Sequence, residues 1–377
     1  MPRVKLQRTG DGTYYVYLPK SSIETKNLKK GDLVDISETD SSILLSPISL
    51  SWSRRRDLKQ TFEVSESSAD LEWKILSGYL SGCLYALFCR KDGKEFSAEQ
   101  ITTANDIIQR LRGIESSINQ KELEFIDVVN YETINAYDEI KRMFKVIKAL
   151  LQQERTLLKS FRLFNVVADS LHRHWTFEKE QINPISFYIH RILSVELQFP
   201  DVLIKSMENP VDCQHVAMVT YILERIGDVI FGMAQNMSRI YVPSNVVDDL
   251  LAYPSVYIEN QIKTRHAFLK NIIDNMEEPM DFFAIKTAEL HKMLDGSEEI
   301  VCTKNANKGL LMRDSTKRWR TKFDEEIVKV VSRIGDPFLL QSILSIAFRF
   351  RELSTYIESL SSRTCQLYYA GRIECHS

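Results

Sequence analysis

The 377-residue sequence is poor in the residues that interrupt helices. It contains 13 glycines and 10 prolines, and a long chain with so few turn formers is expected to form long helices. No apolar run reaches the length of a membrane span, and the N-terminus lacks the apolar core of a signal peptide. We therefore expect a cytoplasmic protein without membrane insertion.

Cysteine usage, charge and motifs exclude further classes of protein. The six cysteines show no CxxC pairing, so we expect reduced thiols rather than a zinc site or a disulfide framework. The formal net charge is −2 at pH 7, so any attraction to nucleic acid must be local. The sequence shows no arrangement of nucleophile, base and oxyanion donor and no glycine loop for phosphates, so we do not expect an enzyme.

The clearest periodic pattern is an apolar seam on one expected helix. Its residues are separated alternately by three and four positions, as on a helix packed lengthwise inside a bundle. They are Val216, Val219, Leu223, Ile226, Ile230, Met233, Met237 and Ile240. Gly227 lies beside the seam, where a missing side chain would let another helix approach. Glu224 and Asp228 are four residues apart and share one helix face.

The same spacing recurs 127 residues later in the chain. The second seam consists of Ile343, Ile346, Phe350, Leu353, Ile357 and Leu360. In this register Arg351 replaces Glu224 and Thr355 replaces Asp228, so one charge is reversed and the other carboxylate is lost. A repeat of this length indicates a duplicated helical bundle.

Residues 1–50 differ from the rest of the chain and favour short strands. Thr13–Leu18, with its aromatic and β-branched residues on alternating sides, predicts one strand, and Asp32–Ile36 and Ile43–Ile48 predict two more short strands. Between the first two, Pro19–Glu24 has room for one helical turn, and glycine turns are expected at residues 11–12 and 30–31. A unit of this size cannot bury enough surface alone, so we expect a dimer with intertwined sheets.

Positive charge is concentrated at the start of this segment. Residues 1–30 carry seven basic and two acidic residues, a balance of +5. Arg3 and Lys5 alternate with apolar residues, so on a strand they would share the face opposite the apolar one. A twofold axis in the dimer would bring two copies of this basic face together and form a stripe able to follow phosphates. The alternative interpretation is a solvated strand face.

Three motifs in this segment resemble the AbrB/SpoVT swapped-hairpin DNA-binding domain. They are Val4–Gly10, Thr13–Lys20 with its Leu-Pro-Lys ending, and Leu28–Val34 with Lys-Gly-Asp. Members of that family dimerise by interleaving strands and bind DNA with basic residues of strands and loops. The resemblance therefore implies double-stranded DNA as a partner, a homodimer, and DNA contacts from four residues: Arg3, Lys5, Arg8 and Lys20.

Two further segments precede the helical half. Residues 51–66 are polar and contain an arginine run at 54–56, a composition that suits a linker. Residues 67–131 predict a small α/β unit. Its expected elements are helices at Leu71–Ser77 and Ala98–Leu111, and strands at Cys83–Cys89, Ile114–Ile118 and Leu123–Val129.

The remainder of the chain predicts two three-helix bundles, at residues 132–245 and 246–377. The first would contain Tyr137–Leu151, Ile185–Phe199 with a start at Asn183-Pro184, and Val216–Ile240. The second would contain Asp248–Asn275, Asp314–Arg333 and Leu339–Cys365. Residues 276–313 are less regular, and the pattern assigns them no role.

This half resembles PhoU, a family of tandem three-helix bundles tied to the control of phosphate uptake. The resemblance rests on Leu223–Asp228, on Arg142-Met143, and on Ile182-Asn183 together with Arg191. The order of modules is that of archaeal PhoU-type transcriptional regulators. The fold class expected is therefore mainly α and multidomain (α+β), with a swapped-hairpin β-barrel, a small α/β unit and tandem PhoU bundles.

The PhoU resemblance also raises the question of a metal. PhoU proteins hold multinuclear metal clusters on paired carboxylates of facing helices, and such clusters need several acidic ligands. Here Lys179, Asn183 and Thr355 stand at positions where acids are expected. Only the Glu224 and Asp228 pair remains as a metal candidate, so we expect no cofactor. The alternative is a divalent or ferric ion on that pair.

The other candidate sites have ordinary structural explanations. His172 and His174 are two residues apart and would point in different directions on a helix, as would Cys213 and His215. A basic patch surrounds Trp319, and we interpret it as a solvated helix face. Its members are Lys317, Arg318, Arg320 and Lys322.

The sequence thus predicts a dimeric, DNA-binding transcriptional regulator of phosphate uptake whose helical bundles sense a signal or dock a partner. The alternative is a PhoU-like adaptor that binds a phosphate transporter or sensor kinase and uses its N-terminal domain only to dimerise. The sequence names no operator, effector or target gene.

Overall fold

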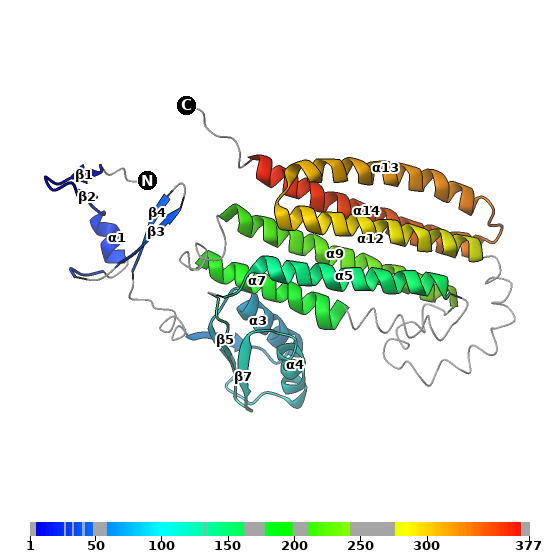
Figure 1. Cartoon of the computed structure of the whole chain (residues 1–377). Coiled ribbons are helices and arrows are strands. Elements are labelled where there is room, and N and C mark those ends of the chain that lie inside the picture. The colour runs from blue at the N-terminus through cyan, green and yellow to red at the C-terminus, as the bar shows by residue number, and fades with distance from the viewer. Residues whose placement is uncertain are drawn as a thin grey trace.

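The structure is a computed structural model that describes residues 5–25, 28–31, 34–39, 42–47, 59–131, 133–161, 178–198, 210–241 and 276–370. This part of the chain is mostly helical with small β-sheets, which confirms the α+β class. The long helices lie side by side in an elongated bundle (Figure 1). None of the helices in these ranges is long and apolar enough to cross a membrane.

The N-terminal module, defined as the described residues between 5 and 47, contains two small antiparallel sheets and one short helix. Its elements are β1 (Gln7–Arg8), β2 (Tyr14–Tyr15), α1 (Lys20–Thr25), β3 (Val34–Thr39) and β4 (Ser42–Pro47). β1 pairs with β2, and β3 pairs with β4. The strand expected over residues 13–18 is shortened to two residues, and Lys5 precedes β1 instead of lying in a strand. The swapped-hairpin barrel stays a prediction for the dimer.

Two glycine turns of this module follow the sequence prediction. Gly12 and Gly31 have φ of +93° and +95°, a left-handed conformation that residues with a Cβ rarely adopt. The first turn is held by Asp11, whose carboxylate accepts hydrogen bonds from the Thr9 hydroxyl and the Thr13 amide. Both turns therefore form where the sequence places them.

A four-stranded sheet with two helices forms the α/β unit. Its elements are β5 (Lys59–Val64), α3 (Ser68–Leu80), β6 (Tyr85–Arg90), α4 (Ala98–Ile108), β7 (Ile114–Ile118) and β8 (Glu122–Asp127). The strand order is β5-β6-β8-β7, with β5 parallel to β6 and the other pairs antiparallel. β5 lies inside the segment 51–66 that we expected to be a linker, so the sheet begins earlier than predicted.

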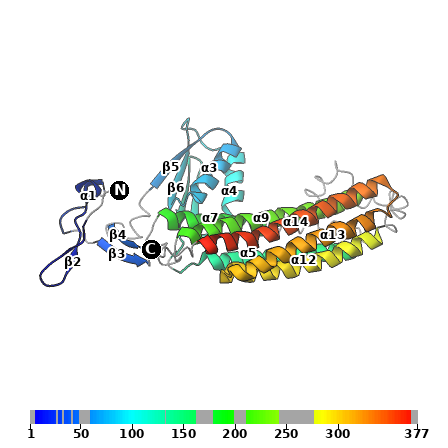
Figure 2. The ribbon, with the colours of Figure 1, turned by 90° about the horizontal axis from the view of Figure 1, so that it is seen from above.

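The two helices of the α/β unit pack together beside the sheet (Figure 2). Leu71 and Ile75 of α3 share a core with Phe88 and Phe125 of the sheet, and all four side chains are buried. The helix α4 begins with a capping box at Ser97, which satisfies amide groups at its first turn.

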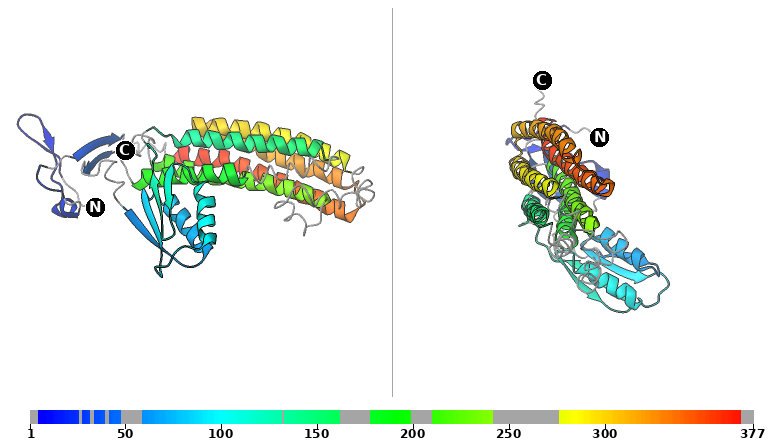
Figure 3. Two further views of the ribbon diagram at one scale, coloured as in Figure 1. Left: turned by 90° about the horizontal axis from the view of Figure 1, so that it is seen from below. Right: turned by 90° about the vertical axis from the view of Figure 1, so that its right-hand side faces the viewer.

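Six long helices and one π-helical turn form the rest of the described chain. They are α5 (Ala136–Lys159), η1 (Glu178–Ile182), α7 (Asn183–Gln198), α9 (Pro210–Tyr241), α12 (Glu277–Thr303), α13 (Ala306–Val331) and α14 (Pro337–Ala370). The α-helix α7 starts at Asn183 as predicted, but the turn η1 precedes it directly. The view along the bundle shows the α/β unit attached to one side of it (Figure 3).

The two seams predicted from the sequence form the centre of the bundle. Every seam residue from Val216 to Met237 is buried, and so is every one from Ile343 to Leu360. The helices that carry them, α9 and α14, pack against each other, and α5 packs against α12. One continuous hydrophobic core runs through both repeats. The repeats are therefore two halves of one packed body.

One expectation about the second repeat is wrong. The less regular pattern of residues 276–313 gave them no assigned helix, yet most of them form α12 and the start of α13. Gly296 and Ser297 weaken the helical pattern of α12, but its packing against α5 and α14 supplies the stabilisation that local propensity does not. The helix expected at Asp248–Asn275 lies outside the described residues.

Candidate nucleic-acid interface and carboxylate pair

The β1–β2 hairpin positions Arg8, one of the residues predicted to contact DNA. Arg8 is the register partner of Tyr14, and its guanidinium carbon lies 5.6 Å from the centroid of the Tyr14 ring. Beside this pair, the Tyr15 hydroxyl donates a hydrogen bond of 2.6 Å to Oε1 of Gln7. The hairpin thus presents an arginine that is oriented by an aromatic ring and remains exposed to solvent.

The other predicted DNA residues are also accessible where the structure describes them. Lys5 and Lys20 are exposed, whereas Arg3 lies outside the described residues. Nζ of Lys20 is 3.5 Å from a carboxylate oxygen of Glu24, but both side chains are more than half exposed, so water weakens this pair. Lys30, in the turn before Gly31, is exposed as well. The described cations can therefore reach a polyanion without breaking a buried interaction.

The same module exposes an unusual amount of apolar surface. On the β3–β4 hairpin, Ile36 stands opposite Leu45 in the register, and residues that alternate along each strand share that face. Val34, Ile36, Ile43 and Leu45 on this face have exposed fractions between 36% and 70%. Hydrophobic patterning predicted these strands, but the alternation that creates one apolar face is a signal that our sequence reasoning did not use.

The predicted carboxylate pair lies on α9 and is engaged by protein donors. The Ser186 hydroxyl on α7 donates a hydrogen bond of 2.9 Å to Oε2 of Glu224. Arg225 pairs with Asp228 at 3.1 Å through Nη1. Burial raises the pKa of Asp228, and the charge of Glu224 raises it further. Both carboxylates therefore stand on one face, as predicted, with partners supplied by the chain itself.

The second repeat carries an arginine ion pair where the first carries this carboxylate pair. Arg351 lies 3.6 Å from Asp324 of α13, and the Thr355 hydroxyl donates to the backbone carbonyl of Arg351. Within the described residues, no three His, Cys, Asp or Glu side chains are grouped so that they could hold a metal ion. The residues that the structure describes at the two matching positions do not supply the several carboxylates that a multinuclear cluster needs.

The histidine and cysteine candidates fall into two groups. His172 and His174 lie outside the described residues. His215 contacts the Thr364 hydroxyl through Nε2 at 3.0 Å, whereas the thiol of Cys213 is 3.9 Å from Glu196. Cys213 and His215 thus face different partners in the protein interior.

The basic patch on α13 is less solvated than we expected. Arg320 is only 20% exposed and pairs with Glu358 at 2.6 Å, while Lys317 lies 3.6 Å from the same carboxylate group. Trp319 is buried and donates its indole N–H to Glu289 at 2.6 Å. Lys317, Arg318 and Lys322 are exposed, as expected of a solvated face, whereas that interpretation is wrong for Arg320, which joins α13 to α14.

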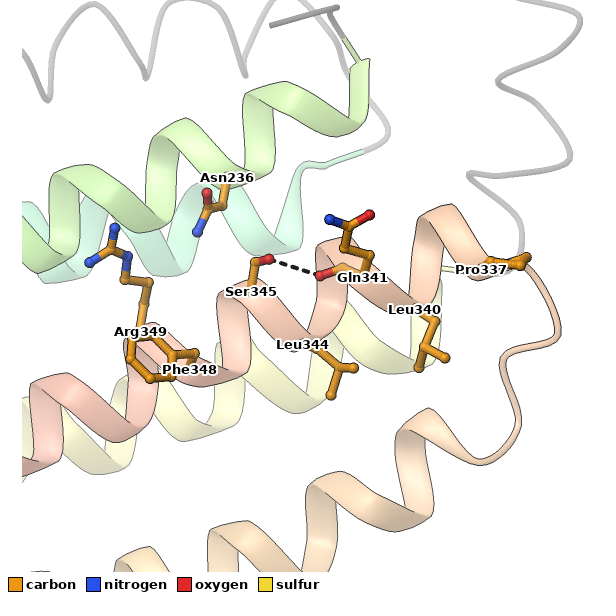
Figure 4. Close-up of a pocket in the computed structure, with 8 residues that line it drawn as sticks. All are labelled: Asn236, Pro337, Leu340, Gln341, Leu344, Ser345, Phe348 and Arg349. Atoms are coloured by element: carbon orange, nitrogen blue, oxygen red, sulfur yellow. Dashed lines mark hydrogen bonds between the residues drawn. The ribbon is translucent and has the colours of Figure 1, made fainter.

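An open groove of about 620 Å³ lies between the end of α9 and the first turns of α14. Figure 4 shows Leu340, Leu344 and Phe348 along one side of α14, and Gln341, Ser345 and Arg349 along the side that faces Asn236 of α9. The exposed fractions of Leu344 and Phe348 are 46% and 65%. The groove presents an apolar stripe with a polar rim.

Comparisons of the chain with protein-family models, with curated proteins and with solved structures found no match. The resemblances to the AbrB/SpoVT and PhoU families therefore remain resemblances of motif and module order.

Proposed function

We propose that this protein is a dimeric DNA-binding regulator in which the N-terminal module grips DNA and the helical repeats receive a signal. The link to phosphate uptake comes from the resemblance to PhoU. DNA is bound chiefly through its phosphates, because the module has exposed cations and residues 1–30 carry a net positive charge.

The observation that carries the proposal is the coexistence of exposed apolar and exposed basic residues on one small module. Ile36 and Ile43 are 63% and 70% exposed in a single chain. A two-stranded hairpin with a bare apolar face is marginal in water and gains stability when another chain covers that face. Dimerisation on this face would double the set of cations that includes Lys5 and Arg8.

A second candidate function is supported by a different observation. The groove at Leu344 and Phe348 lies on the helical repeats, far along the chain from the basic residues, and its apolar stripe suits a helix of a protein partner. This favours the adaptor that binds a phosphate transporter or sensor kinase. In that case the N-terminal module would serve only to dimerise.

The two functions are separated by a charge-reversal experiment. The variant Lys5→Glu, Arg8→Glu, Lys20→Glu should lose binding to a double-stranded DNA of mixed sequence, because each reversal replaces a phosphate contact with repulsion. A matched control reverses three exposed lysines elsewhere: Lys91, Lys121 and Lys329. It changes the net charge equally and should bind as the native protein does.

Sedimentation of both variants completes this experiment. The regulator predicts that the N-terminal variant stays dimeric while its DNA binding is lost. An equal loss of DNA binding in both variants would show that binding responds only to the net charge of the protein. A native protein that fails to bind DNA, yet remains dimeric, would favour the adaptor.

A further inference from the structure

Two buried polar networks lie near the short connection between the α/β unit and the helical bundle. One is centred on Arg191 of α7 and includes Tyr131. The other is centred on Asp212 of α9 and includes Tyr137. The two tyrosines are six residues apart in the chain, at the entrance to α5.

The Arg191 network ties α7 to the α/β unit. The guanidinium of Arg191 is fully buried and pairs with Asp127 at the end of β8, with Nε 3.0 Å from Oδ2. Its other nitrogens donate to the carbonyl oxygens of Tyr79 and Cys83 at 2.8 and 2.9 Å. These acceptors lie at the end of α3 and in the turn before β6, so one side chain reaches α3, this turn and β8.

The connection itself belongs to this network. The Tyr131 hydroxyl donates a hydrogen bond of 2.6 Å to Oδ2 of Asp127, and the amide of Val129 donates to Oδ1 at 2.7 Å. Burial raises the pKa of Tyr131, so this hydroxyl keeps its proton. A buried ion pair whose remaining sites are satisfied tolerates little change in geometry.

The Asp212 network joins the two helical repeats at the same end of the bundle. Oδ1 of Asp212 accepts a hydrogen bond of 2.7 Å from the Tyr368 hydroxyl of α14 and lies 2.8 Å from Nζ of Lys304. Lys304 follows α12, has a left-handed φ of 54°, and places its ammonium group near the rings of Tyr137 and Tyr368. The helix α14 and the turn that follows α12, both in the second repeat, thus converge on one carboxylate of the first.

A histidine extends the network toward α5. The hydroxyl of Tyr137 is 3.2 Å from Nδ1 of His215 and 3.2 Å from the hydroxyl of Tyr368. Nε2 of His215 contacts the Thr364 hydroxyl at 3.0 Å. Burial lowers the pKa of His215 to about 4, so its ring is neutral at physiological pH and the network is a fixed structural link there.

We propose that these two networks form a coupling joint that makes the second repeat, the first repeat and the α/β unit move together, so that a displacement of α14 is transmitted to the sheet. The contacts that would carry it are Tyr368 with Tyr137 at one end and Tyr131 with Asp127 of β8 at the other, and the two tyrosines Tyr137 and Tyr131 are close neighbours in the chain. This inference rests on the proposed regulator, because it states how a signal received by the helical repeats reaches the α/β unit. Its test needs neither DNA nor a partner.

Hydrogen exchange in the full-length protein tests the coupling. Tyr368→Phe removes one hydroxyl from the bundle end, and exchange is read in the peptide that covers β8, on the α/β unit. We expect exchange in β8 to accelerate about threefold or more, since a lost buried hydrogen bond weakens every element whose opening it opposes. Tyr356→Phe on the same helix is the matched control, and it should leave β8 unchanged.

A second variant shows whether the effect travels through Arg191. In Arg191→Met the sheet should exchange about a hundredfold faster, with a much smaller change in α14, because an uncompensated Asp127 is left inside the unit. Adding Tyr368→Phe to Arg191→Met should then have no further effect on β8. Tyr131→Phe, a milder change, should act on β8 in the same direction.

The outcomes against the joint are equally distinct. If Tyr368→Phe loosens only the ends of α9 and α14 while β8 keeps its protection, the two networks are independent and the proposal fails. The proposal also fails if Arg191→Met accelerates exchange by the same factor in the sheet and throughout the bundle. Neither result would affect the DNA-binding proposal, which is tested on the N-terminal module.

Discussion

Ile182 of η1 lies directly against Gly227 of α9, so that a Cβ built on the glycine would stand only 2.6 Å from Cδ1 of the isoleucine. Ile182 is fully buried, and its side chain has little freedom to move away. The sequence predicted a close helix approach at this glycine, and the structure confirms it.

Gly227→Ala is therefore expected to destabilise the protein. Overpacking a core costs about 1–3 kcal/mol, and the better helix propensity of alanine returns about 1 kcal/mol. The free energy of unfolding, measured with denaturant, should fall by about 1 kcal/mol. Gly335→Ala is the control, because a Cβ there meets nothing within 4 Å. A Gly227→Ala protein as stable as the native one would contradict this packing.

The carboxylate pair predicts a pH-dependent effect of Asp228→Asn. The pKa of Asp228 is raised in the folded protein by burial and by Glu224, so its charged form is less favourable there than in the unfolded chain. The asparagine variant should be more stable than the native protein at neutral pH. This advantage should vanish as the pH falls through the raised pKa, because the native carboxyl then becomes protonated.

Asp92 supplies a control of opposite sign. Hydrogen bonding to Arg90 holds the pKa of Asp92 at about 2, so its charged form favours folding above the unfolded pKa. Asp92→Asn should lower stability at neutral pH, with the difference disappearing as the pH falls toward 2. Unfolding curves at several pH values test both variants, and the same sign of effect in both would refute the assignment.

The carboxylates also predict the metal content of the purified protein. Glu224 and Asp228 are engaged by Ser186 and Arg225, and the second repeat places Arg351 at the matching position. We expect elemental analysis to find no stoichiometric iron or zinc. One or more metal ions per chain, lost in the Glu224→Gln, Asp228→Asn double variant, would overturn this expectation.

The apolar face of the β3–β4 hairpin predicts the site of dimerisation. Ile36→Glu should yield a monomer in light scattering, because a charge buried in the dimer contact would be desolvated without a partner. Trp73→Glu on α3 is the control, since Trp73 is 71% exposed but lies outside the module. A dimer that survives Ile36→Glu would place the contact elsewhere.

The sequence predicted those parts of the fold whose signal is local. The three-four spacing located α9 and α14 and their buried faces, because one helix face repeats at that period. It did not locate α12, where Gly296 and Ser297 interrupt the pattern and contacts with α5 decide the structure. The sequence did not predict the start of β5 at Lys59 for a similar reason. The segment is polar, and its composition does not indicate that it pairs with β6.

The polar networks could not be predicted from spacing. His215 and Cys213 looked like a poor metal pair, yet His215 meets Tyr137 and Thr364, which are 78 and 149 residues away in the chain. Arg191 was noticed only through the resemblance to PhoU, and its partner Asp127 lies in a different unit. Contacts of this kind depend on how the helices pack, so the periodicity of the sequence does not predict them.

The most direct test of the central claim is the affinity of the full-length protein for double-stranded DNA as a function of salt concentration. If the dimer contacts about six phosphates, the logarithm of the binding constant should fall with the logarithm of salt concentration at a slope near −5. The Lys5→Glu, Arg8→Glu, Lys20→Glu variant should show no measurable binding. A slope near zero, or binding that survives these substitutions, would contradict the account.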